Sequence, residues 1–184
     1  VLTGRNMIVP VKNEQDSERV WEAVAPAVET ASLALDEMRK KEGLNLYTDL
    51  SSRIDYIESH LADIESLAAA IPEAYRQRLM ERISRLTSDT DVIDPVRITQ
   101  EAAILADKSD VSEEIVRLHS HIQLFREIMD ADVSQGRKLN FMIQEFNREF
   151  NTIGSKAGKA ELSHLVVDLK SELEKIREQV QNVE

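Results

Sequence analysis

Apolar residues return every three or four positions along most of this 184-residue chain, and this spacing constrains its fold more than any other feature. The longest run has intervals of 4, 4, 3, 4, 3 and 3 and consists of Leu46, Leu50, Ile54, Ile57, Leu61, Ile64 and Leu67. Intervals close to a heptad repeat are typical of a long helix that packs along another helix. We therefore expect one side of a helical hairpin here, with Pro72 ending this helix and opening the next.

Similar stripes predict helices before and after this run. A first helix is expected to start near Asp16, to kink at Pro26 and to be weakly interrupted at Gly43. Its predicted buried side consists of Val20, Trp21, Val24, Val28, Ala31, Leu35 and Met38. Further helices are predicted at about 95–107, 112–131 and 136–153. A last helix carries the stripe Leu162, Leu165, Leu169, Leu173, Ile176, Val180 and Val183.

No segment alternates with the period of two that a half-buried strand requires. The chain is therefore predicted to be all-α, with long antiparallel helical hairpins and coiled-coil-like packing. Residues 1–15 lack a helical period and are expected to be a linker or the tail of a missing N-terminal domain. Residues 16–94 are predicted to be a long helical hairpin region, and residues 95–184 a second helical domain.

The amino-acid composition limits the kinds of ligand and partner that this chain is expected to bind. The chain has no cysteine, which excludes disulfides and thiolate metal sites and fits a reducing compartment. No apolar run approaches the roughly 20 residues that span a bilayer, so we expect a cytoplasmic protein with no membrane partner. The formal net charge of -11 argues against a general attraction to nucleic acid, and no DNA partner is expected.

One segment departs from this acidic background. Residues 136–159 contain five basic and two acidic residues, which gives a local charge of +3. On a helix, with about 100° per residue, an apolar arc faces an arc of Arg, Asn, Gln and Ser: Arg137, Asn140, Gln144, Asn147, Arg148, Asn151 and Ser155. Asn is a poor helix former, so an ordinary solvated face explains this polar stripe badly. An amide-rich interface with a partner helix and a surface that binds phosphates, sugars or bases explain it equally well.

A second group of functional side chains precedes this segment. Asp110 and Glu113 have the spacing of a capping box at the start of a helix. Glu114, Arg117 and His121 follow on one helix face at i, i+3 and i+7. A carboxylate, a guanidinium and an imidazole can bind a metal and a phosphate, or act as general acid and base. An ordinary Glu114–Arg117 ion pair beside a boundary histidine is the simpler interpretation.

These segments carry a family resemblance. QEAAILADKSDVSEEIVRLHSHI, GRKLNFMIQEFNREFNTIGSK and ELSHLVVDLKSELEKIREQVQNVE together resemble the C-terminal region of the YicC/YloC family of bacterial endoribonucleases. The likeness is close over about the last 90 residues and looser over the helices before them. The family pattern joins an EE pair and a downstream histidine, here Glu113, Glu114 and His121, to the GR-L-F--QE-NRE-NT--SK block. Asn140 departs from the pattern, in which an aspartate usually follows GRKL.

The resemblance implies a metal-dependent endoribonuclease that cleaves single-stranded RNA and assembles as a ring-like homo-oligomer, expected to be a hexamer. In such an enzyme a divalent cation, Mn²⁺ or Mg²⁺, activates water or stabilises the departing oxygen. The implied catalytic residues are Glu114, His121 and Glu149, and the implied metal ligands are Glu114, His121 and Glu145. The implied RNA-binding residues are Arg117, Arg137, Gln144, Asn147, Arg148, Asn151 and Lys156. The alternative is a helical oligomerisation or adaptor module without catalytic activity, whose amides form a subunit interface.

Overall fold

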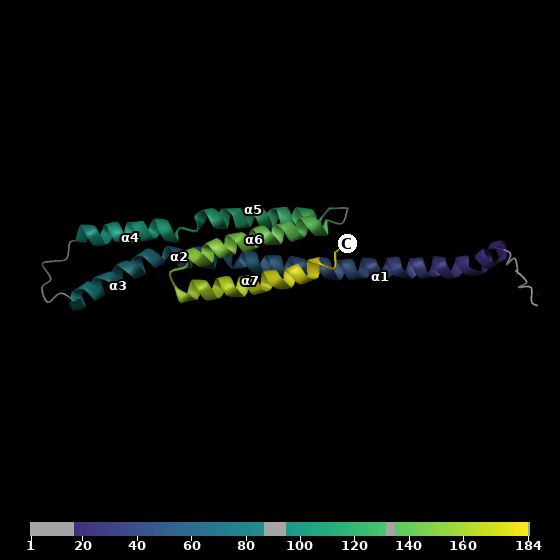
Figure 1. The fold of residues 1–184 in the computed structure, drawn as a ribbon, viewed down its shortest axis with the longest axis horizontal. Coiled ribbons are helices and arrows are strands. Elements are labelled where there is room, and N and C mark those ends of the chain that lie inside the picture. The colour runs from purple at the N-terminus through teal and green to yellow at the C-terminus, as the bar shows by residue number, and fades with distance from the viewer. Residues whose placement is uncertain (1–16, 87–94, 132–134, 184) are drawn as a thin grey trace, which may run out of the picture. The chain divides into compact units, whose positions relative to one another are not determined.

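The computed structural model describes residues 17–86, 95–131 and 135–183, and every regular element in them is an α-helix, as predicted (Figure 1). The helices are α1 (Ser17–Ser59), α2 (Leu61–Ala69), α3 (Ile71–Leu86), α4 (Pro95–Ser109), α5 (Ser112–Met129), α6 (Gly136–Lys156) and α7 (Ala160–Val180). None of these helices combines the length and apolarity needed to cross a bilayer. The predicted tail at 1–15 lies outside the described residues, as does residue 94, where the predicted hairpin region ends.

The helix boundaries differ from the sequence prediction at two places. α1 runs through Gly43 without the expected break, because one glycine inside a helix costs only about 1 kcal/mol. The long apolar run is instead divided at His60, between α1 and α2, which the spacing of apolar residues did not indicate. Pro72 lies in the first turn of α3, where its missing N–H costs nothing, as predicted.

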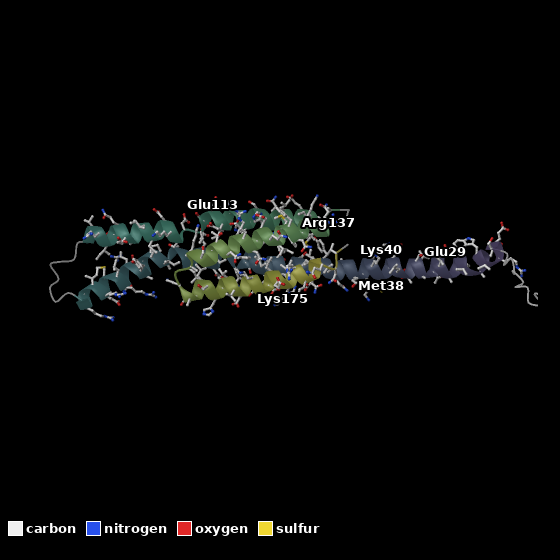
Figure 2. All side chains as sticks on the ribbon, in the orientation of Figure 1. Glu29, Met38, Lys40, Glu113, Arg137 and Lys175 are labelled. Atoms are coloured by element: carbon white, nitrogen blue, oxygen red, sulfur yellow. The ribbon has the colours of Figure 1, made fainter. Side chains whose placement is uncertain are left out.

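The chain divides into two units, Val1–Asn45 and Leu46–Glu184. The described part of the smaller unit is the N-terminal portion of α1, and its predicted buried side is exposed. The large side chains of this face are between 45% (Val24) and 63% (Trp21) exposed, and Figure 2 labels one of them, Met38, on α1. The prediction of burial is wrong for the single chain, because no second described element of this unit packs against the helix.

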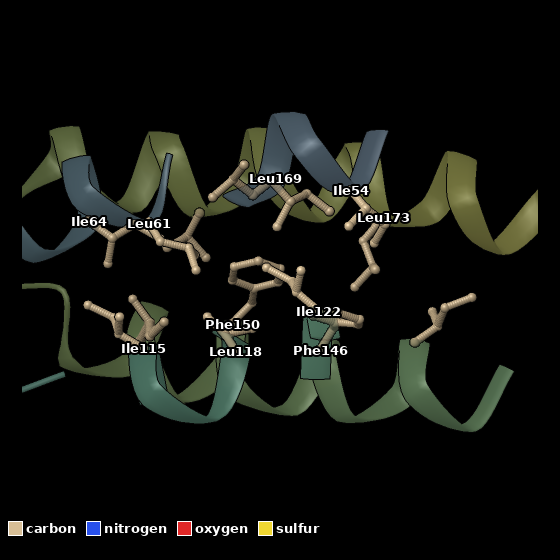
Figure 3. Close-up of a cluster of buried hydrophobic side chains, with 14 of the residues drawn as sticks. Ile54, Leu61, Ile64, Ile115, Leu118, Ile122, Phe146, Phe150, Leu169 and Leu173 are labelled. Carbon is tan, nitrogen blue, oxygen red and sulfur yellow. The ribbon is translucent and has the colours of Figure 1, made fainter. Parts of the chain in front are cut away.

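The larger unit, Leu46–Glu184, contains the hydrophobic core. α5 lies along α6, α6 along α7, and α3 along α4, so consecutive helices form antiparallel hairpins. Figure 3 shows side chains of α1, α2 and α7 meeting side chains of α5 and α6 in the core. The fully buried residues include Ile54, Ile57, Leu61, Ile64, Leu118, Ile122, Phe125, Phe146, Phe150 and Leu169. The predicted apolar run at 46–67 and the apolar arc of the 136–156 helix are therefore confirmed as core.

Candidate functional site on helices α5 and α6

Glu114, in the first turn of α5, is a carboxylate in the core, with only 4% of its surface exposed. Both of its oxygens lie 2.9 Å from Nζ of Lys156, the last residue of α6. Lys156 also donates to the backbone carbonyl of Asp110 at 2.7 Å. A buried carboxylate needs such a partner, because a charge left unpaired in the core costs several kcal/mol. In this conformation the Nζ of Lys156 is therefore bound to the carboxylate of Glu114.

Arg117, one turn further along α5, is partly exposed and contacts a second buried carboxylate. Its Nη1 lies 3.6 Å from Oε1 of Glu149 on α6, and its Nη2 binds Glu113. The charge of Glu113, and then that of Glu149, raises the pKa of Arg117 above its ordinary value. The predicted Glu114–Arg117 pair is therefore wrong. Arg117 forms ion pairs with Glu113, one turn earlier in α5, and with Glu149 of α6. Glu114 instead pairs with Lys156 of α6.

The predicted capping box at the start of α5 is wrong, because the N-cap residue is Val111 and no side chain caps the helix from that position. Oδ1 of Asp110 accepts a hydrogen bond from the backbone N–H of Ser112 at 2.9 Å. This bond is the main reason that the pKa of Asp110 lies below its ordinary value. Glu113 does not reach back to complete the predicted capping box, because its carboxylate binds Arg117.

Two buried polar atoms of this helix pair have no hydrogen-bond partner among the described residues, namely Nε2 of His121 and Oε2 of Glu149. The ring of His121 lies edge-on to Phe146, with ring centres 5.9 Å apart. Glu149 follows Phe146 by three residues, so both atoms lie near the same stretch of α6. An unpaired buried polar atom costs about 1–3 kcal/mol, so these atoms mark a place where binding a water molecule or a ligand is favourable.

The predicted polar stripe of α6 is largely accessible. Arg137, Gln144, Arg148 and Asn151 are exposed, and Asn140, Glu145 and Asn147 are half-buried. Asn151 accepts a hydrogen bond from Nζ of Lys170 on α7 at 2.9 Å. Lys170 adds a cation to this surface that the sequence did not indicate, because the contact crosses a hairpin and has no local spacing signal.

The predicted metal ligands are not assembled around a common point. A divalent cation needs several oxygen or nitrogen ligands that converge. In the part of the chain that the structure describes, no group of three or more His, Asp or Glu side chains can hold a metal ion. Glu114 is occupied by Lys156, and Glu149 faces Arg117. In this conformation Glu114, His121 and Glu145 do not fit a shared metal.

Comparison with known proteins identifies the family. Residues 64–184 match the family model described as the C-terminal region of YicC-like endoribonucleases. The chain is 47% identical over 173 residues to the probable endoribonuclease YicC of Clostridioides difficile, a match that covers 94% of this chain and 59% of that protein. The chain belongs to the YicC-like endoribonuclease family. The resemblance seen in the sequence is thereby confirmed.

A second YicC relative gives the same result at lower identity. The probable endoribonuclease YicC of Haemophilus influenzae is 34% identical over 171 residues, with 93% of this chain and 58% of that protein covered. The chain thus spans less than two thirds of the length of these curated relatives. The region matched by the YicC-like family model includes all of α5, α6 and α7, and with them every site residue discussed above.

Proposed function

We propose that this YicC-like chain supplies the catalytic helices of an endoribonuclease that cleaves single-stranded RNA. Family membership and the names of the two relatives support the activity class. The observation that carries the choice of site is the pair of unpartnered buried atoms, Nε2 of His121 and Oε2 of Glu149. Buried polar atoms without a partner are expected at a site that binds a ligand. The surface beside them carries exposed guanidinium groups.

Cleavage of a phosphodiester needs a base for the attacking oxygen, an acid for the departing oxygen and cations for the phosphate. His121 and Glu149 are the candidates for the two proton-transfer roles. Arg117 lies between Glu149 and solvent, with 47% of its side chain exposed, and is placed to contact the phosphate. The two unpartnered atoms are closed to solvent in this conformation, so the proposal requires local opening of the α5/α6 pair when RNA binds.

In this proposal Glu114 takes no part in proton transfer. Its contacts are those of a positioning residue, because both oxygens are held by Lys156 at the end of the α5/α6 hairpin. We propose that the pair fixes the register of α5 against α6. That register sets which residues of α6 lie opposite Arg117 and His121.

The polar stripe of α6 is the proposed RNA-binding surface. Guanidinium and amide groups donate to phosphate oxygens and to the edges of bases, and unpaired strands leave those edges accessible. Arg137 and Arg148 are the proposed phosphate contacts, with Gln144, Asn147 and Asn151 as hydrogen-bonding groups between them. A local basic surface on an otherwise acidic chain favours this defined site over general binding of nucleic acid.

Three further properties are proposed for the whole enzyme from the family resemblance: dependence on Mn²⁺ or Mg²⁺, a ring-like homo-hexamer and a cytoplasmic location. The proposal assigns no catalytic step to the cation, because the described residues do not converge on one. Loss of cleavage with a chelator and its return with Mn²⁺ would support the cation requirement. Full activity in excess chelator would refute the cation requirement.

The site is tested by cleavage of an end-labelled single-stranded RNA by the Glu149→Met variant of the full chain. We expect at least a hundredfold slower cleavage, because proton-transfer groups contribute about 10²- to 10⁴-fold. Stability should not fall, because a buried carboxylate with one unpartnered oxygen is replaced by an apolar side chain of similar length. Glu174→Met, on the exposed side of α7, is the control and should cleave normally. Unchanged rates in both Glu149→Met and His121→Gln would refute the site.

The alternative function, an oligomerisation module, is favoured by the exposed apolar face of α1. Arg148→Glu separates the two functions, because Arg148 is exposed on the polar stripe of α6. An RNA-binding stripe predicts weaker RNA binding by an unchanged oligomer. An interface made by the stripe predicts a smaller oligomer instead.

A further inference from the structure

Phe141 is a large aromatic side chain on the solvent side of α6. The chain has four phenylalanines, of which Phe125, Phe146 and Phe150 are fully buried, whereas Phe141 is 59% exposed. With about 100° per residue, Phe141 lies about 150° around the helix from the middle of the apolar arc of α6. Packing of the core therefore does not explain this residue.

The residues around Phe141 on the helix surface are polar. Residues three and four positions apart are neighbours on an α-helix, and for Phe141 they are Arg137, Lys138, Gln144 and Glu145. Arg148 follows at i+7, within about 20° of Phe141 around the helix axis. Phe141 thus lies at the edge of the polar stripe of α6, between the two arginines proposed as phosphate contacts.

Both of these arginines are available for a ligand. Among the residues that the structure describes, neither the guanidinium of Arg137 nor that of Arg148 has an ion-pair partner. Arg117 and Arg126 of α5, in contrast, each bind two carboxylates. The aromatic ring of Phe141 therefore lies between two cations whose charge is not neutralised within the chain.

The spacing along α6 places Phe141 where a base can reach it. At 1.5 Å per residue, Phe141 lies about 6 Å from Arg137 and about 10 Å from Arg148 along the helix axis. The two arginines are therefore about 16 Å apart, which is farther than adjacent phosphates of one strand. If both bind the same strand, at least one nucleotide lies between the contacted phosphates, beside Phe141.

We propose that Phe141 stacks on an unpaired base of the RNA strand whose phosphates bind Arg137 and Arg148. This inference rests on the RNA-binding function proposed above for the polar stripe of α6. Proteins that bind single-stranded RNA combine cations for the backbone with aromatic side chains for the faces of the bases. Neighbouring bases cover these faces in a duplex, so Phe141 selects unpaired RNA without selecting its sequence.

A protein partner explains Phe141 less well than RNA does. The buried centre of a protein interface is depleted of charged residues, but Phe141 has Arg137 one turn before it and Arg148 two turns after it. A guanidinium in such an interface loses water and needs an acidic partner, whereas RNA supplies phosphates along the whole strand. The local charge of +3 over residues 136–159 also attracts a polyanion.

Fluorescence anisotropy of the full chain with a labelled single-stranded RNA tests the stacking. The RNA is 2′-O-methylated so that it is not cleaved during the measurement. Phe141→Leu keeps an apolar side chain but loses the aromatic face, and we expect about tenfold weaker binding. Phe141→Trp should bind at least as tightly as the unchanged chain. Val116→Ala, which shortens a 65% exposed side chain of α5, is the control and should bind normally.

Two further measurements separate stacking from charge. Stacking releases no counterions, so Phe141→Leu should keep the wild-type slope of log affinity against log salt, which Arg148→Ala should lower. A strand of base-free sugar phosphates of the same length offers no base to stack on. The unchanged chain and Phe141→Leu should bind this strand equally well, and an equal loss of affinity on both strands would overturn the stacking.

The possible results distinguish this inference from the proposed function. If the unchanged chain does not bind the RNA, the RNA-binding stripe and the role of Phe141 both fail. If the unchanged chain binds the RNA and Phe141→Leu binds it equally well, only the role of Phe141 fails. A smaller particle mass for Phe141→Leu in light scattering, with RNA affinity retained, would assign Phe141 to a protein contact and would also refute the stacking.

Discussion

Lys156 of α6 binds Glu114 of α5 through both carboxylate oxygens, at 2.9 Å each. Lys156→Met removes the cation and leaves a carboxylate unpaired in the core. We expect a loss of about 3 kcal/mol in the free energy of unfolding, measured with urea. Glu114→Gln should cost less, about 1 kcal/mol, because the amide carries no charge and still accepts a hydrogen bond.

The control for this prediction is Arg177→Met. Arg177 pairs with Glu174 on α7, and both side chains are about half exposed, so this pair should contribute less than about 1 kcal/mol. Equal losses for Lys156→Met and Arg177→Met would show that burial of Glu114 adds nothing to the pair.

Arg148→Ala tests the RNA-binding stripe. If Arg148 contacts a phosphate, the variant binds single-stranded RNA more weakly, and the slope of log affinity against log salt falls by about 0.7. Fluorescence anisotropy with a labelled oligonucleotide at several salt concentrations measures both quantities. Arg97→Ala, which removes an exposed arginine of α4, should keep the wild-type slope. An unchanged slope for Arg148→Ala would place the RNA elsewhere.

Gly136, the first residue of α6, has no room for a side chain. A Cβ there would lie 2.6 Å from the backbone oxygen of Val183. Gly136→Ala must displace the end of the chain from α6, and we expect a loss of about 1–3 kcal/mol in thermal unfolding. Gly154→Ala, in the last turns of the same helix, meets only Val166 at 3.5 Å and should be neutral or stabilising by up to about 1 kcal/mol. The same sign of change for both variants would contradict the close approach.

Glu172 of α7 makes stability depend on acid pH. Its pKa lies below the ordinary value of 4.5, mainly because Lys175 and then Arg53 bind the carboxylate. A lowered pKa in the folded state gives stability that is complete above the unfolded-state pKa and is lost as pH falls through the folded-state pKa. Glu172→Gln should therefore be less stable at pH 7 and should lose less stability between pH 5 and about 3.

Glu161→Gln is the comparison for this pH dependence. Glu161 is exposed at the start of α7, and its replacement should leave the stability profile close to that of the unchanged chain. Parallel pH profiles for Glu172→Gln and the unchanged chain would rule out the contribution of Glu172.

Helix positions and the core of the larger unit were predictable because both depend on local spacing. The stripe that includes Ile54 and Leu61, and the arc that includes Phe146 and Phe150, are buried where the intervals placed them. Two boundaries were not predictable in this way. Continuity through Gly43 follows from the small cost of one glycine in a helix, and the division at His60 has no signal in the apolar spacing.

The candidate site was predictable only as a set of residue types. The sequence placed Glu114, Arg117 and His121 on one face, but the pairing that it favoured was wrong. Lys156 is 42 residues from Glu114 and Glu149 is 32 residues from Arg117, so no helical spacing signals either contact. Burial of Glu149 was also missed, because it lies at the flank of the apolar arc of α6.

The sequence by itself determined that the chain is helical, which faces are apolar and which family it belongs to. Periodicity is a property of each helix alone, and the family pattern is a property of residue order. The tertiary structure decided which charges pair, which polar atoms lose their partners, and that the stripe from Trp21 to Met38 is uncovered in the single chain. Those outcomes depend on which helices meet, because burial and ion pairing are properties of two surfaces in contact.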